Sequence, residues 1–234
     1  MSKIDSNGIE HGKRGNKVYV GLKNQQVIKD LYSPTNPRTS AQQKHRAKLA
    51  FANRLSAHLS EAVNLGFARV AEETKGLTPR NAFVKANWDN GAMRWNEESS
   101  LWELCPERLL LANGPRHIPS GITAELDGNL LRITCPDAGL YEMHAVPDDQ
   151  LLVAVYLPDL PAMTLYRGPM RDSCSQCTFE LPTEMCASGS QMHVYAWSCA
   201  TSFHRATATK SQVRPDQSSP SRHLGTFHIP TSIH

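Results

Sequence analysis

The chain has 234 residues, of which 40% are hydrophobic and 20% are charged. This composition is typical of a globular protein with a core of its own, and it excludes collagen-like and charge-dominated disordered chains. The net charge of +3 is uneven, with +7 on residues 1–75, −5 on residues 76–170 and +1 on residues 171–234. A basic front and an acidic middle favour contacts between copies of the chain, or an acidic partner for the front.

The first residues are polar, with no apolar run that would form the core of a signal peptide. No stretch approaches the roughly 18 to 20 apolar residues that cross a bilayer. We therefore expect no signal peptide, no membrane span, and a location in the cytoplasm or in a virion.

The first predicted element is a β-hairpin. Residues 17–22 and 25–29 are β-prone runs on either side of Lys23 and Asn24, which supply the turn. Residues 1–16, rich in glycine and lysine, are expected to be flexible. Because two strands alone are marginally stable in water, the hairpin is expected to pack on a neighbour.

The next segment carries the strongest local signal, a helix start. Pro37 holds Asn36 extended, Thr39 can cap the helix that follows Arg38, and Gln42 stands where a capping-box partner is expected. A one-sided apolar stripe then predicts a helix from about residue 40 to about residue 72, which must lie on another surface. The stripe comprises Phe51, Leu55, Leu59, Val63 and Val70, with Gly66 as a point of bending or close packing.

A short helix is predicted from Thr78 and Pro79 to about Asn87. Threonine is a favoured cap, and proline at the first helical position loses no hydrogen bond. Residues 1–100 are thus interpreted as a basic domain of hairpin and helices.

Beyond about residue 100 the apolar period changes from that of helices to that of strands. Seven or eight short strands are expected, including 107–111 and an apolar central strand at 151–157, separated by proline and glycine. This spacing predicts an immunoglobulin-like antiparallel β-sandwich over residues 101–210. Residues 211–234 are rich in Ser, Pro and His, and are interpreted as a polar tail without a core. The predicted fold class is α+β.

Six cysteines raise the question of a metal site. Cys174 and Cys177 form a C-x-x-C pair that Cys186 and Cys199, or His193 and His204, can complete as zinc ligands. The spacing matches no standard zinc finger, so structural thiols without a cofactor are the preferred interpretation, and zinc is the alternative.

Two further groups suggest binding. The basic residues Lys13, Arg14, Lys44 and Lys48 are candidate nucleic-acid contacts. The tryptophans of residues 88–102, next to Glu97 and Glu98, indicate an ordered linker or, alternatively, a carbohydrate site. No catalytic motif is found, so we expect no enzymatic activity.

One segment resembles a known pattern. Residues 36–48, Asn-Pro-Arg-Thr-Ser-Ala-Gln-Gln-Lys-His-Arg-Ala-Lys, are similar to the helix start Asn-Pro-Arg/Gln-Thr-x-x-Gln-x-x-x-Arg of an uncharacterised family encoded in Bacteroidetes genomes and their phages. Gly12, Gly15, Val18 and Gly21 match its glycine-rich hairpin, and residues 77–87 match its short helix. The likeness covers roughly residues 12–90, and Leu49 departs from the usual Phe. It implies a hairpin, a long helix beginning at the motif (Asn36, Pro37, Arg38, Thr39, Gln42 and Arg46), and a β-rich half.

Together these features predict a structural assembly protein, most simply a phage virion component of the tail, neck or capsid. Its expected partners are other copies of itself and neighbouring particle proteins. A nucleic-acid-binding protein, or a carbohydrate- or metal-binding module, is the alternative.

Overall fold

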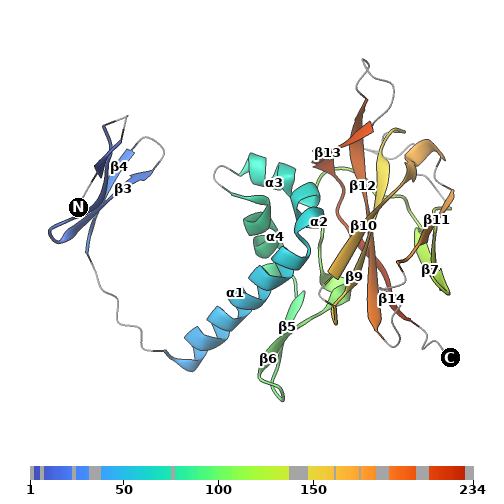
Figure 1. The fold of residues 1–234 in the computed structure, drawn as a ribbon, viewed down its shortest axis with the longest axis horizontal. Coiled ribbons are helices and arrows are strands. Elements are labelled where there is room, and N and C mark those ends of the chain that lie inside the picture. Colours follow the sequence, from blue (N-terminus) through green and yellow to red (C-terminus); the bar gives the residue numbers. More distant parts are fainter. Residues whose placement is uncertain are drawn as a thin grey trace. The chain divides into compact units, whose positions relative to one another are not determined.

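A computed structural model describes residues 3–5, 8–22, 25–31, 38–74, 77–136, 147–160, 162–173, 175–182, 190–203 and 211–229. The chain divides into two compact units, residues 1–43 and 44–234, and the dividing point lies inside a helix (Figure 1). The expected division near residue 100 is not seen, because the helices share a core with the β-rich part. The turn at Lys23 and Asn24 and the motif residues Asn36 and Pro37 lie outside the described residues.

The N-terminal unit holds one antiparallel sheet with strands in chain order. The predicted hairpin is present as β3 and β4, which pair Val18 with Lys29 and Val20 with Val27. Two further strands extend it where a flexible start was expected. β2 pairs with β3 and β1 pairs with β2, and this pairing orders residues of low β-propensity. The strands are β1 (Lys3–Ile4), β2 (Glu10–Arg14), β3 (Lys17–Leu22) and β4 (Gln25–Asp30).

The long predicted helix begins at Ser40 as expected, but it is bent into three pieces. Hydrogen bonds from Leu59 N to Leu55 O and from Phe67 N to Val63 O continue through both bends. Leu59 and Phe67 are fully buried at the bends, so the bends keep the apolar stripe against the core. The pieces are α1 (Ser40–His58), α2 (Ser60–Gly66) and α3 (Ala68–Glu73).

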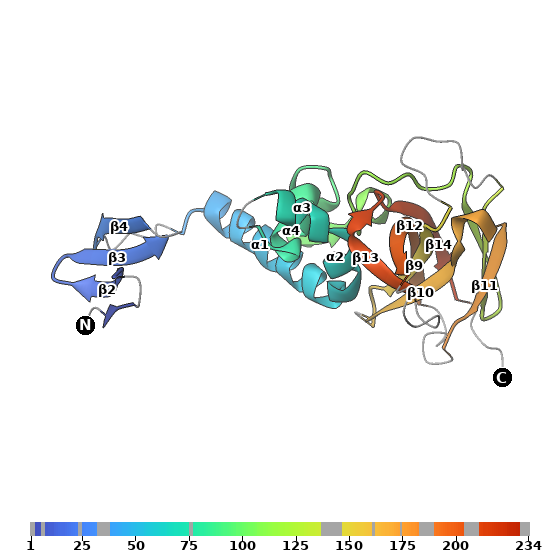
Figure 2. The ribbon, with the colours of Figure 1, turned by 90° about the horizontal axis from the view of Figure 1, so that it is seen from above.

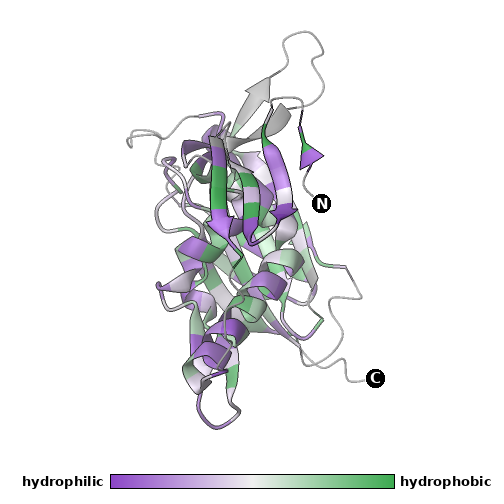
Figure 3. Cartoon of the chain, turned by 90° about the vertical axis from the view of Figure 1, so that its left-hand side faces the viewer, coloured by the Kyte–Doolittle hydropathy of each residue, from purple (hydrophilic) through white to green (hydrophobic). Residues whose placement is uncertain are grey.

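The short helix is α4 (Pro79–Trp88), and its predicted start is confirmed: Thr78 Oγ1 accepts a hydrogen bond from Asn81 N at 3.2 Å. The helices carry hydrophilic and hydrophobic residues side by side, as elements do that cover a core on one side (Figure 3). None of the described helices combines the length and the apolar character that a membrane crossing requires.

A two-stranded hairpin, β5 (Met93–Asn96) and β6 (Leu101–Leu104), follows the helices and pairs Trp95 with Trp102. The strand expected at 107–111 is absent. Pro106 instead opens a single 3₁₀ turn, η1 (Pro106–Arg108). Proline fixes its own φ and offers no N–H to a neighbouring strand, which favours this turn over a strand.

The largest sheet has five antiparallel strands centred on the 13-residue β12. β9 pairs with one edge of β12. On the other edge, β14 pairs with residues 191–196 of β12 and β13 pairs with residues 199–203. β10 pairs with the far side of β9. The strands are β9 (Gln150–Leu157), β10 (Ala162–Met170), β12 (Gln191–Phe203), β13 (Ser211–Ser218) and β14 (Arg222–His228).

The structure differs from the expected coreless tail at residues 211–229, which contain β13, β14 and the buried Ile229. Serines make this segment polar in composition, yet Ser218 and Ser219 are fully buried. Ser218 Oγ donates to Gly66 O at 3.0 Å, and Ser219 Oγ accepts from Ser198 N at 2.9 Å. These serines are therefore satisfied by hydrogen bonds in the interior, which composition does not reveal.

A smaller sheet of three antiparallel strands lies on one face of the large sheet, and helices α2–α4 lie on the other (Figures 1 and 2). Alternate residues of β9 separate the two cores: Leu151, Val153 and Val155 face the small sheet, whereas Leu152 and Ala154 face the helices. The small sheet consists of β7 (Thr123–Asp127), β8 (Leu130–Thr134) and β11 (Gln176–Glu180), and η2 (Arg171–Ser173) precedes β11.

The architecture of residues 44–234 is thus helix layer, large sheet, small sheet. The predicted α+β class is confirmed, and two antiparallel sheets do face each other. The immunoglobulin-like form of the sandwich stays a prediction, since a helix layer covers the outer face of one sheet here.

A buried ion pair fixes one end of the large sheet. Arg171 and Asp149 are almost fully buried, with Arg171 Nε and Asp149 Oδ2 3.7 Å apart. Arg171 Nη2 also donates to His117 O and to Ser198 Oγ. These bonds hold the loop that contains His117 against the sheet, a structural role that the sequence did not indicate.

Candidate functional site

The N-terminal sheet is a single layer. Among the described residues before 44, none is buried. Apolar side chains occupy both faces, because cross-strand neighbours share a face: Val20 pairs with Val27, and Tyr19 with Ile28. Ile28 is 52% exposed and Val20 is 38% exposed. A sheet of this size without a covered apolar face has little to stabilise it alone.

The same sheet is basic. Residues 1–43 contain seven Lys or Arg and three Asp or Glu, a net charge of +4. Lys13 and Arg14, two of the predicted nucleic-acid contacts, are exposed on β2. Arg14 Nη1 lies 3.9 Å from Glu10 Oε1. Basic side chains and apolar side chains therefore share this surface.

The helix-start motif has the local geometry expected of a cap, with one change. Thr39 Oγ1 accepts from Gln42 N at 3.3 Å. The side chain that reaches back is that of Gln43, whose Nε2 donates to Arg38 O at 2.8 Å, and not that of Gln42. Arg38 has a positive φ of 49°, so the chain turns sharply as it enters α1. Arg46 is exposed on the second turn of the helix.

Lys44 and Lys48, the predicted nucleic-acid contacts on α1, lie on tryptophan rings. Lys48 Nζ is 4.5 Å from the ring centre of Trp88 and 5.0 Å from that of Trp102, and Lys44 Nζ is 4.5 Å from that of Trp95. These cation–π contacts stabilise the β5–β6 hairpin against α1. Both lysines are thus engaged within the chain, and the tryptophan faces they cover are closed to a sugar ring.

Glu97 contacts Lys44 and Trp95 of the group formed by these lysines and tryptophans. One of its carboxylate oxygens accepts from Trp95 Nε1 at 2.9 Å, and the other lies 3.3 Å from Lys44 Nζ. The hydrogen bond from Trp95, and then Lys44, lower the pKa of the Glu97 carboxyl, so it stays ionised. Glu98 is exposed and donates its backbone N–H to Asn96 Oδ1.

The structure describes two of the four cysteines that are candidate zinc ligands, and these two lie on opposite sides of the large sheet. Cys199 is buried on the helix-facing side of the large sheet, together with Trp197. Cys177 packs on the other side, in the core between the sheets. Cys174 and Cys186 lie outside the described residues. Within the described residues, no three His, Cys, Asp or Glu side chains are grouped as metal ligands.

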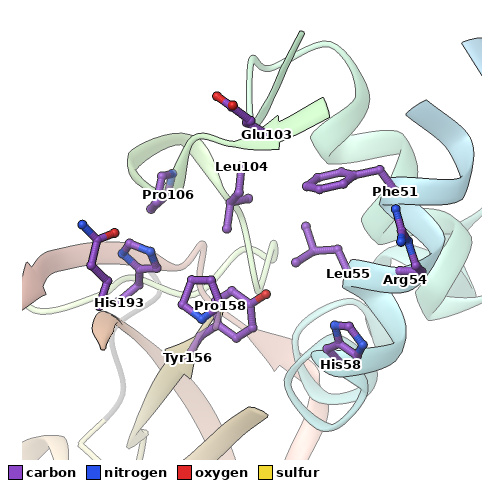
Figure 4. Close-up of a pocket in the computed structure, with 11 residues that line it drawn as sticks. Phe51, Arg54, Leu55, His58, Glu103, Leu104, Pro106, Tyr156, Pro158 and His193 are labelled. Carbon is purple, nitrogen blue, oxygen red and sulfur yellow. The ribbon is translucent and has the colours of Figure 1, made fainter. Parts of the chain in front are cut away.

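Sequence reasoning missed a cavity of about 480 Å³ in residues 44–234 (Figure 4). Helix α1 forms one wall, β6 and η1 form the second, and the ends of β9 and β12 form the third. Its lining residues are Phe51, Arg54, Leu55, His58, Glu103, Leu104, Pro106, Tyr156, Pro158, Gln191 and His193.

Two buried aromatic residues form the floor of the cavity. Tyr156 is 5% exposed and His193 is 4% exposed, and their rings lie 6.4 Å apart. Burial raises the pKa of the Tyr156 phenol, and the charge of Asp159 raises it further. Burial lowers the pKa of His193, and the neighbouring His223 adds to this effect. Both side chains are therefore held in their neutral forms.

The periodicity of α1 indicated that Phe51 and Leu55 face inward. It could not show that β9 and β12, about a hundred residues later, bring Tyr156 and His193 opposite them. Pairing of Tyr156 with His193 across the sheet is a long-range contact that no local pattern encodes.

A scan against protein-family models, a search of the curated proteins and a search of the solved structures each find no match. The resemblance to the Bacteroidetes and phage pattern therefore stays a prediction, supported by residues 12–90 of the sequence alone.

Proposed function

We propose that this chain is a non-enzymatic structural protein of a multi-subunit particle, a phage virion component of the tail, neck or capsid. In this proposal the N-terminal sheet is the docking element and a second copy of the chain is its first partner. The single observation that carries the proposal is the lack of any buried residue among the described residues of the sheet.

A folded sheet requires buried apolar surface. Ordering a residue costs about 1–2 kcal/mol of backbone entropy, which burial of apolar surface has to offset. Val18, Val20, Val27 and Ile28 can provide that burial only when another surface covers them. The strand edge of β4 is a second site where another chain can add.

Charge favours a second copy as the partner. The N-terminal unit carries +4, and residues 76–170 carry −5. Exposed acidic residues of that middle segment include Glu98, Glu107, Glu125, Asp127 and Asp159. Opposite charges on two parts of one chain promote head-to-body association between copies and raise its rate.

The apolar stripe of the helix gives the assembly proposal no support. Leu55, Leu59 and Val63 are at most 5% exposed, and they belong to the same buried cluster of residues 44–234 as Tyr156 and Trp197. The chain covers this stripe itself, so the proposal depends on the N-terminal sheet.

A nucleic-acid-binding role is the second candidate, favoured by the exposed cations Lys13, Arg14, Lys17 and Lys29 on the sheet. The carbohydrate alternative has less support, since lysines cover the tryptophan faces. The metal alternative also has less support, since Cys177 and Cys199 lie on opposite sides of the large sheet.

The test is the mass of the full chain in solution as a function of concentration and salt. We expect species larger than the 26.0 kDa monomer by light scattering, and regular assemblies by electron microscopy. A matched variant lacking residues 1–43 keeps the cores of residues 44–234 and should stay monomeric. A full chain that is monomeric at every concentration, or that associates only with added DNA or RNA, would contradict the proposal.

A further inference from the structure

We propose that the cavity between α1, β6 and the ends of β9 and β12 binds a small amphipathic carboxylate, an aryl or alkyl chain that carries one anionic group. This site is independent of the assembly proposal, because it lies wholly within residues 44–234 and uses no residue of the N-terminal sheet.

The first observation is a hydroxyl that faces the cavity. Tyr156 is 95% buried, yet its hydroxyl makes no hydrogen bond to any described residue. Figure 4 shows this hydroxyl turned into the cavity toward α1. A hydroxyl on the wall of a cavity can donate a hydrogen bond to an oxygen of a ligand. Because burial raises its pKa, the phenol remains protonated and acts as the donor.

The second observation is the guanidinium group of Arg54 at the mouth. Arg54 and His58 stand one turn apart on α1 and line the cavity, and neither makes an ion pair or a side-chain hydrogen bond with the described residues. The one lining carboxylate, that of Glu103, is already held by Asn96 Nδ2 at 2.6 Å and by Arg94 Nη2 at 3.7 Å. The exposed Arg54 guanidinium at the mouth therefore favours an anion, because guanidinium groups bind carboxylates through paired hydrogen bonds.

The third observation is the apolar remainder of the lining. Phe51, Leu55, Leu104, Pro106 and Pro158 offer hydrocarbon surface between the donors. A volume of about 480 Å³ lies within the range of small-molecule sites, which is roughly 300–1,000 Å³. A fully polar anion would leave this surface uncovered, so the ligand needs an apolar body.

The test is calorimetric titration of the full chain with 3-phenylpropionate and with octanoate. The uncharged 3-phenylpropanamide serves as the matched control ligand. We expect both acids to bind at one site and the amide to bind about tenfold more weakly or worse, as the loss of a charge-assisted hydrogen bond requires. Equal binding of acid and amide, or no binding of either acid at millimolar concentration, would overturn the proposal.

Variants locate the site. Arg54→Gln should weaken acid binding about tenfold, and Tyr156→Phe should weaken it severalfold while the amide is less affected. Arg69→Gln, on α3 and away from the cavity, should bind as the natural chain does. Thermal unfolding of each variant separates lost binding from lost folding. Unchanged affinity in a folded Arg54→Gln variant would contradict the assignment.

Discussion

Thr39 caps the start of α1, near the end of the N-terminal unit. Its Oγ1 accepts from Gln42 N, and without it this N–H at the helix start loses its acceptor. Thr39→Ala should destabilise α1 by about 1 kcal/mol, and Thr39→Ser should not. Denaturant unfolding followed by circular dichroism measures the difference. An alanine variant of unchanged stability that fails to associate would make Thr39 a contact residue instead.

The pair His193 and His223 makes stability depend on pH. Burial lowers the pKa of both imidazoles in the folded chain, and the charges of Glu107 and, at His193, Asp159 only partly oppose this. The unfolded chain therefore binds more protons just below the ordinary histidine pKa of about 6.5. The free energy of unfolding should fall as the pH drops from about 7 to about 5.

Replacement of both histidines by glutamine should flatten that slope. Equilibrium unfolding at a series of pH values gives the comparison with the natural chain. If the double variant loses stability on acidification as steeply as the natural chain, other groups cause the effect.

The role of a single residue could be predicted where that residue bonds to its near neighbours in the sequence. The caps at Thr39 and Thr78 each depend on a backbone N–H three residues away, and both were predicted. The Lys48 contacts with Trp88 and Trp102 join residues 40 and 54 positions apart. These contacts form only in the folded chain, so the sequence did not predict them.

Gly66 is the point where the helix layer touches the loop after η1. A Cβ there would meet the carbonyl oxygen of Leu111 and approach Ala112 Cα to 2.5 Å. Alanine would gain about 1 kcal/mol of helix propensity, but backbone atoms cannot move away cheaply. Gly66→Ala should therefore destabilise the chain by about 1–3 kcal/mol.

Asn64→Ala, at an exposed position of the same helix, is the control and should change stability by less than about 0.5 kcal/mol. Chemical denaturation of both variants measures the change in the free energy of unfolding. A Gly66→Ala variant as stable as the natural chain would show that α2 can shift away from the loop.

The presence of β13 and β14 predicts that residues 211–234 are needed for stability, whereas their polar composition predicted a dispensable tail. A dispensable tail could be removed without effect, whereas β13 and β14 pair with one whole edge of β12. A variant lacking residues 211–234 should lose cooperative thermal unfolding, because the central strand and Ser198 lose their partners. A truncated chain that melts at the natural temperature would show that the edge of β12 needs no cover.

Element prediction succeeded where the apolar period was strong, as in α1, α4 and β9, and failed where polar residues are buried. β14 has the sequence Arg-His-Leu-Gly-Thr-Phe-His, which shows weak alternation and contains glycine. It becomes a strand because β12 offers unpaired backbone groups along its edge. The bends at Leu59 and Phe67 likewise follow from the shape of the core, which the helix stripe alone does not specify.

Across the whole molecule, the two compact units, residues 1–43 and 44–234, differ in how they are stabilised. Residues 44–234 contain two cores on the two faces of one sheet. The described part of residues 1–43 contains a sheet and no core. The α+β class and the presence of an N-terminal hairpin were predictable from period and turn residues. The division of the chain at residue 43 was not, because it depends on which elements share a core.

The most direct measurement is hydrogen–deuterium exchange of the β2–β4 amides in the full chain, at dilutions where it is monomeric and at concentrations where it associates. If another subunit completes the sheet, the amides of Val18, Val20 and Val27 should exchange rapidly in the monomer and become protected in the assembly. Strong protection of these amides in a monomeric chain would contradict the account, since the sheet would then be stable without a partner.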